Sequence, residues 1–376
     1  MIRFLHTGDW QLGMTRHFFS EGVGERYAQS RFDAIRELGR VAEEEECSFM
    51  LVCGDVFDSN YVDRKTVSRA VEALKNLPVP VYLLPGNHDP LDAASVYSRS
   101  AFLERKPDHV HVIDSSDPIL VEEGLEIVGV PWFSKRPMRD LVTPVLEGLE
   151  QSAGTVRICA AHGIVDSLAP DPDSPELISL EASEKAISRG KIHYLALGDR
   201  HSVTDVGETG RAWYAGTPES TDFKEVKSGF ALVTRISEDD VSVQEVEIGK
   251  WTFIERAGID MNTEEDLEAL REWFEGLENK ERLVLKLRFA GSVSLSLNRD
   301  LMEFVDGAKE IAGAVETRYK DLTVIPEDTD FTELGLSGFA QKTVERLREL
   351  DANPDSSSSR ARDALALLVR LAGGDS

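Results

Sequence analysis

The chain has 376 residues, of which 41% are hydrophobic and 29% are charged, and its 68 acidic and 42 basic side chains give a formal net charge of −26. This length is typical of two or three globular domains. The acidic average excludes a uniformly basic DNA-packing protein, so a polyanionic ligand would have to bind at a local basic surface or through bound cations.

Cysteine usage and apolar runs narrow the class of protein further. Cys47, Cys53 and Cys159 share no C-x-x-C spacing and are too few for a disulfide framework or a thiolate zinc site. No apolar run reaches the ~20 residues that span a bilayer, and the N-terminal sequence begins as a strand instead of a secretion signal. We therefore expect a cytoplasmic protein that has no contact with a membrane.

Short apolar strands alternate with amphipathic helices over the first 230 residues or so. The predicted strands are 2–5, 49–53, 79–84, 125–130, 156–161 and 193–197, and the predicted helices are 25–46, 64–77 and a segment around 137–149. This alternation predicts a layered α/β domain. Three further strands, at 213–215, 230–236 and 241–248, follow without intervening helices, so we expect the sheets to finish antiparallel.

A second, smaller α+β unit is predicted to begin near residue 251. Its elements are a strand, a helix at 264–276, strands at 282–289 and 293–297, a helix at 300–312 and a strand at 315–324. An acidic link and two amphipathic helices, 337–350 and 360–371, complete the chain. The pattern therefore predicts three parts, with boundaries 1–250, 251–325 and 326–376.

The two C-terminal helices each carry an apolar stripe at helical spacing. The stripes consist of Leu336, Phe339, Ala340, Val344, Leu347 and Leu350 in the first helix, and Ala361, Ala364, Leu365, Leu368 and Leu371 in the second. Such a stripe either packs against its own chain or binds a partner protein. The pattern by itself leaves both alternatives open.

Five short segments follow apolar strands and contain residues that can bind metal ions. They are Gly8-Asp9-Trp10-Gln11, Gly54-Asp55-Val56-Phe57-Asp58, Gly86-Asn87-His88-Asp89, Ala161-His162-Gly163 and Gly198-Asp199-Arg200-His201. Loops that leave the ends of adjacent strands converge at one edge of a sheet. Asp, Asn and His suit Mn²⁺, Fe²⁺ or Mg²⁺. A single Gly-Asp pair is more often an ordinary turn, but five such segments in one chain favour a metal site.

The order and spacing of these segments resemble the calcineurin-like metallophosphoesterase superfamily. More narrowly, the chain resembles the SbcD-type DNA double-strand-break repair exonucleases in the segments FLHTGDWQLG, VCGDVFDSN, LPGNHDP, AAHG, LALGDRHS and WYAGTPESTDF. These motifs cover residues 1 to about 225. The later parts match the family's capping domain and ATPase-binding segment in order and size only. The resemblance implies a two-sheet α/β sandwich with a small α+β capping domain and C-terminal helices.

The resemblance also implies a site that holds two divalent metal ions. The implied ligands are Asp9 and His201 for the first metal, Asp55 as the bridge, and Asn87 and His162 for the second metal. His88 would lie over the scissile phosphate and stabilise the transition state or protonate the leaving oxygen. We expect Asp89 to orient His88 by a hydrogen bond.

Two positions depart from the family pattern. Gln11 stands where the first motif usually has a histidine, and Asp199 stands where the fifth motif usually has a second histidine. Oxygen donors in place of two imidazoles favour Mn²⁺, with Mg²⁺ or Fe²⁺ as alternatives. His6 and His17 are near enough in sequence to replace a lost ligand, but an ordinary strand and loop histidine is the simpler interpretation.

Basic residues near the five segments are candidates for DNA phosphate contacts. These candidates are Arg16, Arg99, Lys135, Arg136, Arg139, Arg200 and Arg211. Each one alone is more often a solvated surface charge. The cluster at 135–139 is the densest of them.

The resemblance implies a nuclease with 3′–5′ exonuclease and single-strand endonuclease activity in DNA repair or recombination. It also implies a homodimer, and an SbcC-type coiled-coil ATPase as a partner of the C-terminal helices. Two alternatives stay open, namely a small-molecule phosphodiesterase and a catalytically weakened scaffold that binds DNA ends. The continuation of the second motif into Ser59-Asn60 argues against a protein phosphatase.

Overall fold

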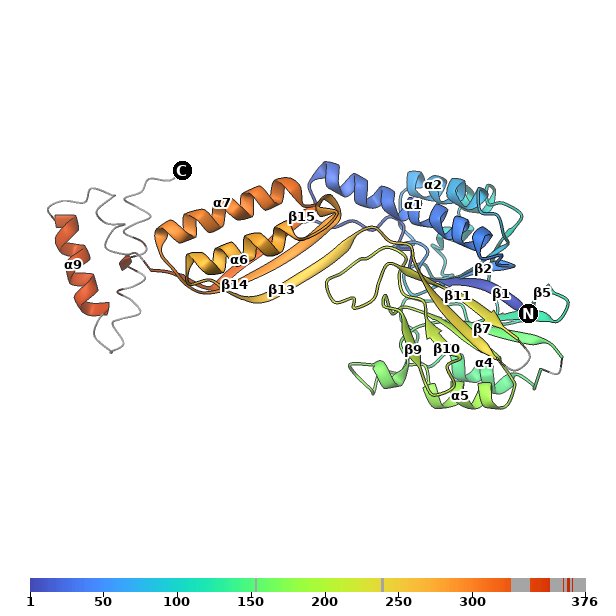
Figure 1. Cartoon of the computed structure of the whole chain (residues 1–376). Coiled ribbons are helices and arrows are strands. Elements are labelled where there is room, and N and C mark those ends of the chain that lie inside the picture. The colour runs from blue at the N-terminus through green and yellow to red at the C-terminus, as the bar shows by residue number, and fades with distance from the viewer. Residues whose placement is uncertain are drawn as a thin grey trace. The chain divides into compact units, whose positions relative to one another are not determined.

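The computed structural model describes residues 1–152, 154–237, 240–325 and 339–351, together with residues 361, 364, 365 and 367. The chain divides into two compact units, Met1–Trp251 and Thr252–Ser376. No helix in these ranges is long and apolar enough to cross a membrane. Figure 1 shows the elements of both units.

Two six-stranded sheets form the centre of the first unit. The first sheet has the order β12 (Val241–Glu247), β11 (Phe230–Ile236), β1 (Ile2–Thr7), β2 (Phe49–Cys53), β3 (Val81–Leu84) and β4 (Val110–Val112). The second has the order β5 (Ile119–Glu122), β6 (Leu125–Gly129), β7 (Val156–His162), β8 (Tyr194–Gly198), β10 (Ala212–Tyr214) and β9 (Thr204–Val206). β11 pairs antiparallel with both β1 and β12, so the predicted antiparallel finish is confirmed.

Alternation along the strands sorts their side chains into two layers of core. In β2, Phe49 and Leu51 face the second sheet, whereas Met50 and Val52 face the helices. β7 and β8 alternate in the same way between the two sheets and the helices of the second sheet. A strand that is buried on both faces reads as a continuous apolar run, which is the pattern that these sequences show. The first unit is therefore the predicted α/β sandwich.

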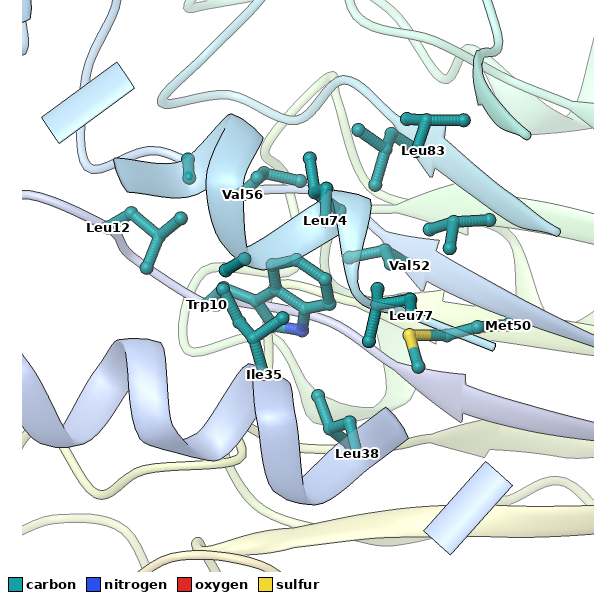
Figure 2. Close-up of a cluster of buried hydrophobic side chains, with 14 of the residues drawn as sticks. Trp10, Leu12, Ile35, Leu38, Met50, Val52, Val56, Leu74, Leu77 and Leu83 are labelled. Atoms are coloured by element: carbon teal, nitrogen blue, oxygen red, sulfur yellow. The ribbon is translucent and has the colours of Figure 1, made fainter. Parts of the chain in front are cut away.

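Helices cover the outer face of each sheet. Their bounds are α1 (Glu21–Glu44), α2 (Arg64–Lys75), α3 (Ser100–Leu103), α4 (Val142–Gly148) and α5 (Leu180–Ser188). Ile35 and Leu38 of α1 and Leu74 of α2 pack against the strands around the ring of Trp10, which is 1% exposed. Figure 2 shows this cluster, in which the indole lies between the two helices and the first sheet.

The helices that cover the second sheet were predicted less accurately from the sequence. The segment predicted around 137–149 is helical only from Val142, because the Asp140 carboxylate accepts hydrogen bonds from the backbone N–H groups of Val142 and Thr143 and caps the helix there. α5 was not predicted. Its buried face contains Ser183, Ala186 and Ile187, and such small side chains give a weak apolar period.

The second unit contains a three-stranded parallel sheet. Its elements are β13 (Thr252–Asp260), α6 (Glu264–Glu275), β14 (Leu283–Val293), α7 (Leu295–Ile311) and β15 (Ala314–Val324), with β14 in the centre. α6 and α7 lie side by side against one face of the sheet (Figure 1). Leu285, Leu287 and Phe289 of β14 face the helices and form the core with Leu301 and Val305 of α7.

The strand predicted at 293–297 is wrong. β14 runs on to Val293, and α7 begins at Leu295 because the Ser294 hydroxyl caps it by accepting from the backbone N–H of Leu297. The alternation Val-Ser-Leu-Ser-Leu imitates a strand over these five residues. The burial of Leu297 and Leu301, four residues apart, shows the helical period that decides the structure.

The C-terminal part is described only in pieces. α9 (Phe339–Asp351) overlaps the first helix predicted there, at 337–350, and ends one residue later. The link 326–338 and most of the second helix predicted at 360–371 lie outside the described residues. Val344, Ala361 and Leu365 are buried, so these stripe residues pack within the chain itself.

Replacing Trp10 tests the core that supports the first loop. We expect Trp10→Ala to lower the free energy of unfolding by about 3–5 kcal/mol, because a fully buried indole leaves a cavity. The measurement is the urea midpoint followed by circular dichroism. Leu120→Ala is the control, since Leu120 is 71% exposed and its loss should cost less than about 0.5 kcal/mol. Equal midpoints for the two variants would contradict this account of the core.

Candidate metal centre

The loops after β1, β2, β3, β7 and β8 converge at the carboxyl ends of the two sheets. β1, β2 and β3 are parallel neighbours in the first sheet, and β7 and β8 are parallel neighbours in the second. Asp9, Asp55 and Asn87 follow the first three strands, His162 ends β7, and Asp199 follows β8. The structure thus brings together residues that lie up to 190 positions apart.

Three of these side chains form a buried group of ligand atoms. One ligand atom each from Asp9, Asp55 and His162 lies within 4.8 Å of the others. All three residues are at most 2% exposed. Two buried carboxylates this close together repel each other unless a positive charge compensates them.

Glycines let the strands approach each other closely at this point. A Cβ on Gly54, whose φ is +90°, would stand 2.0 Å from Nδ1 of His162. A Cβ on Gly86 would stand 2.2 Å from the Asp55 carboxylate. Any side chain at these two positions would therefore displace a candidate ligand.

Backbone strain is concentrated at the same loops. Of the six non-glycine residues with positive φ in the described ranges, four lie here, namely Asp9 (52°), Gln11 (50°), Asp55 (53°) and Asp199 (94°). Such conformations cost of order 1–3 kcal/mol each and persist only where the surroundings impose them. Hydrogen bonds do so: the Asp9 N–H donates to the Gly54 carbonyl, and the Asp199 N–H donates to the Asp9 carboxylate at 3.0 Å.

His162 is oriented to offer one nitrogen to the cluster. Its Nδ1 donates to the Cys53 carbonyl at 2.9 Å, which leaves Nε2 as the free nitrogen. Nε2 lies 3.2 Å from Oδ1 of Asn87, 3.4 Å from Oδ1 of Asp55 and 3.5 Å from Oδ1 of Asp199. A ring fixed by a backbone carbonyl, with its other nitrogen among oxygen donors, is the arrangement of a metal-binding histidine.

Two effects oppose each other in the cluster: burial disfavours the charged carboxylates, whereas His162 holds the pKa of Asp55 below its usual value. Burial raises the pKa of Asp9 to about 7. Burial alone would lower the pKa of His162, but the Asp55, Asp199 and Asp9 carboxylates around it raise its pKa well above the usual value. The carboxylates thus attract positive charge, which a divalent cation in the same place would supply strongly.

His201 approaches Asp9 from the loop after β8. Its Nε2 lies 3.8 Å from Oδ1 of Asp9, and its Nδ1 lies 2.8 Å from Oε1 of Glu225 and from the hydroxyl of Thr221. A carboxylate that accepts from one histidine nitrogen aims the other at a metal. Sequence reasoning missed Glu225, which lies just past the segment WYAGTPESTDF and belongs to no strand-end motif.

Gln11 provides a direct test of whether a cation fits. Its Nε2 donates to Oδ2 of Asp55 at 3.0 Å, and its Oε1 is buried without a hydrogen-bond partner. A buried amide oxygen without a partner costs about 1–3 kcal/mol, and a bound cation would remove that cost. The donors present, two imidazoles and several carboxylate and amide oxygens, fit a hard divalent cation.

The structure holds His88 in a way that differs from the expected one. Nδ1 of His88 donates to the Asp58 carbonyl at 2.7 Å. Asp89, which we expected to orient this ring, instead accepts from the N–H groups of Gly86 and Phe57 and from the Tyr97 hydroxyl. The carboxylate of Asp89 is fully buried and fixes the backbone of the loop, so Asp58 replaces it as the partner of the ring.

The candidate DNA-binding residues fall into three groups. The guanidinium groups of Arg16, Arg99 and Arg200 are bound within the chain, to the Thr221 carbonyl, to the carbonyls of Val62 and Asn60, and to the Thr204 hydroxyl respectively. Lys135, Arg136 and Arg139 are exposed in the loop after β6. The carbonyl of Arg211 pairs with the N–H of Leu195 near the start of β8, away from the end of that strand that carries Asp199.

The two histidines considered as substitute ligands lie elsewhere. His6 is fully buried, and its nitrogens contact the Tyr194 hydroxyl and the Leu197 carbonyl. His17 is exposed and packs against Phe18. Neither belongs to the cluster of Asp9, Asp55 and His162.

Metal binding can be measured through stability. We expect Mn²⁺ to raise the unfolding temperature of the wild-type chain, because a ligand at 100 times its Kd adds about 2.7 kcal/mol. Asp55→Asn should lose most of this shift, since it removes the central carboxylate. The control Asp108→Asn changes an exposed acid and should keep the full shift. An Mn²⁺ shift that survives in Asp55→Asn would contradict the assignment of this centre.

Comparison with known proteins agrees with this geometry. A model of the calcineurin-like phosphoesterase family matches residues 2–235. The uncharacterized metallophosphoesterase YhaO of Bacillus subtilis is 23% identical over 292 residues, covering 75% of this chain and 68% of that protein. The SbcD subunit of the nuclease SbcCD of Bacillus subtilis is 23% identical over 355 residues, covering 85% of this chain and 88% of that protein.

Sequence identity to solved structures is lower. A dimetal phosphatase from Danio rerio is 13% identical with a TM-score of 0.41, covering 66% of this chain and 98% of that one. The match to the family model spans more than half of the chain and includes every loop of the candidate metal centre. The chain therefore belongs to the calcineurin-like phosphoesterases, a family of metal-dependent phosphoester hydrolases.

Proposed function

We propose that this phosphoesterase is a DNA nuclease with 3′–5′ exonuclease and single-strand endonuclease activity. The observation that carries the proposal is the position of the basic loop. Trp132 donates from its indole nitrogen to the His162 carbonyl at 2.7 Å, and Lys135, Arg136 and Arg139 follow on the same exposed loop. Cations on a loop that is hydrogen-bonded to the phosphoester-cleaving centre suit a substrate that carries phosphates on both sides of the bond to be cut.

The similarity to the SbcD subunit of the nuclease SbcCD supports the proposal from another direction. That similarity covers 355 residues, whereas the family model ends at residue 235. It therefore includes much of the second unit, which the phosphoester chemistry does not need.

The proposed ligands divide into two sets, one for each cation. Asp9, His201 and Gln11 would hold one cation, Asp55 would bridge, and Asn87, His162 and Asp199 would hold the other. Bound there, the two cations would lower the pKa of water and neutralise charge on the phosphate. Because most donors are oxygens, we propose Mn²⁺ as the natural metal, with Mg²⁺ or Fe²⁺ as alternatives.

His88 is the group proposed to handle the proton of the leaving oxygen. The hydrogen bond from Nδ1 to the Asp58 carbonyl fixes the tautomer, so Nε2 is the nitrogen that remains available. Its backbone N–H donates to Oδ1 of Asp55 at 2.9 Å, which ties the residue to the cluster. In its protonated form His88 would donate the Nε2 proton to the oxygen of the departing DNA strand.

The assembly proposed for this enzyme is a homodimer that binds an SbcC-type coiled-coil ATPase in the cytoplasm. The C-terminal stripes are the proposed ATPase-binding surface. Because Val344, Ala361 and Leu365 are buried within the chain, those three residues would have to be released from it to contact a partner.

Replacing His88 tests the proposed chemistry. We expect wild-type protein with Mn²⁺ to cut linear single- and double-stranded DNA, and His88→Ala to cut about 10²–10⁴-fold more slowly through loss of general-acid catalysis. His111→Ala, an exposed histidine on β4, is the matched control and should cut normally. Hydrolysis of a small phosphodiester with no cutting of DNA would instead favour the small-molecule phosphodiesterase. Binding of DNA ends without cutting would favour the scaffold.

Salt dependence tests the basic loop. Each lost phosphate contact should reduce the slope of log K against log salt by about 0.7–0.9. We expect Lys135→Ala/Arg136→Ala to bind DNA more weakly with a lower slope. Lys185→Ala/Arg189→Ala removes the same charge from exposed positions at the C-terminal end of α5 and should keep the wild-type slope. An unchanged slope in the first variant would dismiss the loop as a DNA contact.

A further inference from the structure

Two aromatic side chains are exposed to solvent on loops that reach the metal centre, one through Asp55 and the other through the hydrogen bond from Trp132 to His162. Tyr61, in the loop after β2, is 81% exposed, and Phe133, in the loop after β6, is 58% exposed. The two loops leave different sheets. Large exposed rings on two loops of one site need an explanation, because burying a ring of this size is strongly favourable.

Each exposed ring is next to a buried residue that is firmly held. Asn60 is 3% exposed; its Nδ2 donates to the Pro90 carbonyl at 2.9 Å, and its Oδ1 accepts from the N–H of Val96. Trp132 is 5% exposed and donates to the His162 carbonyl. The backbones at Tyr61 and Phe133 are therefore fixed by their neighbours, and little chain entropy remains to be lost when a ring binds a ligand.

Asn60 and Trp132 are both hydrogen-bonded to one short segment, Pro90-Leu91. Asn60 bonds to Pro90, and the N–H of the next residue, Leu91, donates to the Trp132 carbonyl at 2.8 Å. Pro90 follows directly after Asn87-His88-Asp89, the third loop of the centre. Each exposed ring is thus one residue away from a residue that is hydrogen-bonded to the segment immediately after His88.

We propose that Tyr61 and Phe133 stack on unpaired nucleobases of the DNA near the phosphate being cut. The proposal rests on the nuclease function proposed above and adds which side chains would recognise the bases of an unpaired strand. Aromatic side chains stack on every base without sequence preference, whereas bases inside a duplex already stack on each other. Lys135, Arg136 and Arg139, on the loop of Phe133, supply the charge that neighbouring phosphates require.

Binding to DNA with and without bases tests this assignment. The probes are a dT 12-mer and a 12-mer of the same charge in which every nucleotide is abasic, and affinity is measured by fluorescence anisotropy in EDTA, so that nothing is cut. We expect the wild-type protein to bind the dT 12-mer more tightly. Phe133→Ala and Tyr61→Ala should each weaken dT binding by about 5–150-fold, the equivalent of 1–3 kcal/mol per stacked base.

The abasic probe and the conservative variants separate stacking from general damage. Both alanine variants should bind the abasic 12-mer as the wild type does, and Phe133→Tyr and Tyr61→Phe should restore dT binding. Leu120→Ala removes an equally exposed apolar side chain on β5 and should change neither affinity.

Three results would overturn the proposal. Equal loss of dT and abasic binding in an alanine variant would mean that its ring supports the loop and does not stack on bases. Unchanged dT binding in an alanine variant would remove that ring from the DNA surface while the nuclease function stands. If the wild-type protein binds neither probe and cuts no DNA with Mn²⁺, the nuclease function itself fails, and the stacking proposal fails with it.

Discussion

The burial of two mutually repelling carboxylates, those of Asp9 and Asp55, is the constraint on which the candidate metal centre depends. Both carboxylates are buried at the edge where the two sheets meet, with one ligand atom of each within 4.8 Å of the other. The chain opposes this repulsion with the Asp199 N–H, the His88 N–H and the amide of Gln11. Such donors compensate only part of the charge, so the site favours a cation strongly.

Holding this edge together also explains several features that otherwise disfavour folding. Positive φ at Asp9 and Asp55 turns each loop sharply back toward the neighbouring strand. The Gly54 position leaves room for the His162 ring, and the buried indole of Trp10 packs the first loop onto α1 and α2. The large core on both faces of the first sheet therefore stabilises a strained and negatively charged edge.

Much of this arrangement could be predicted from the sequence, because ligand residues at the ends of apolar strands have only one edge at which to meet. The alternating strands and helices predicted a layered α/β domain, and the two-sheet sandwich was what the family resemblance implied. What the sequence does not contain is which neighbour orients which side chain. Glu225 and Asp58 hold His201 and His88 through contacts across loops, and Asp89 bonds to backbone groups instead. At 293–297 the alternation of apolar and polar residues led to the prediction of a strand, although α7 begins at Leu295.

The two departures from the family pattern have a common physical consequence. Gln11 keeps an oxygen at the cluster and uses its amide N–H groups to bond to Asp55, which a metal-binding imidazole nitrogen would not do. Asp199 places a carboxylate 3.5 Å from Nε2 of His162 and so adds negative charge beside it. As ligands, they would exchange imidazole nitrogen donors for harder oxygen donors, and Asp199 would raise the negative charge of the site. Both changes favour hard divalent cations over softer ones, since these bind oxygen ligands preferentially.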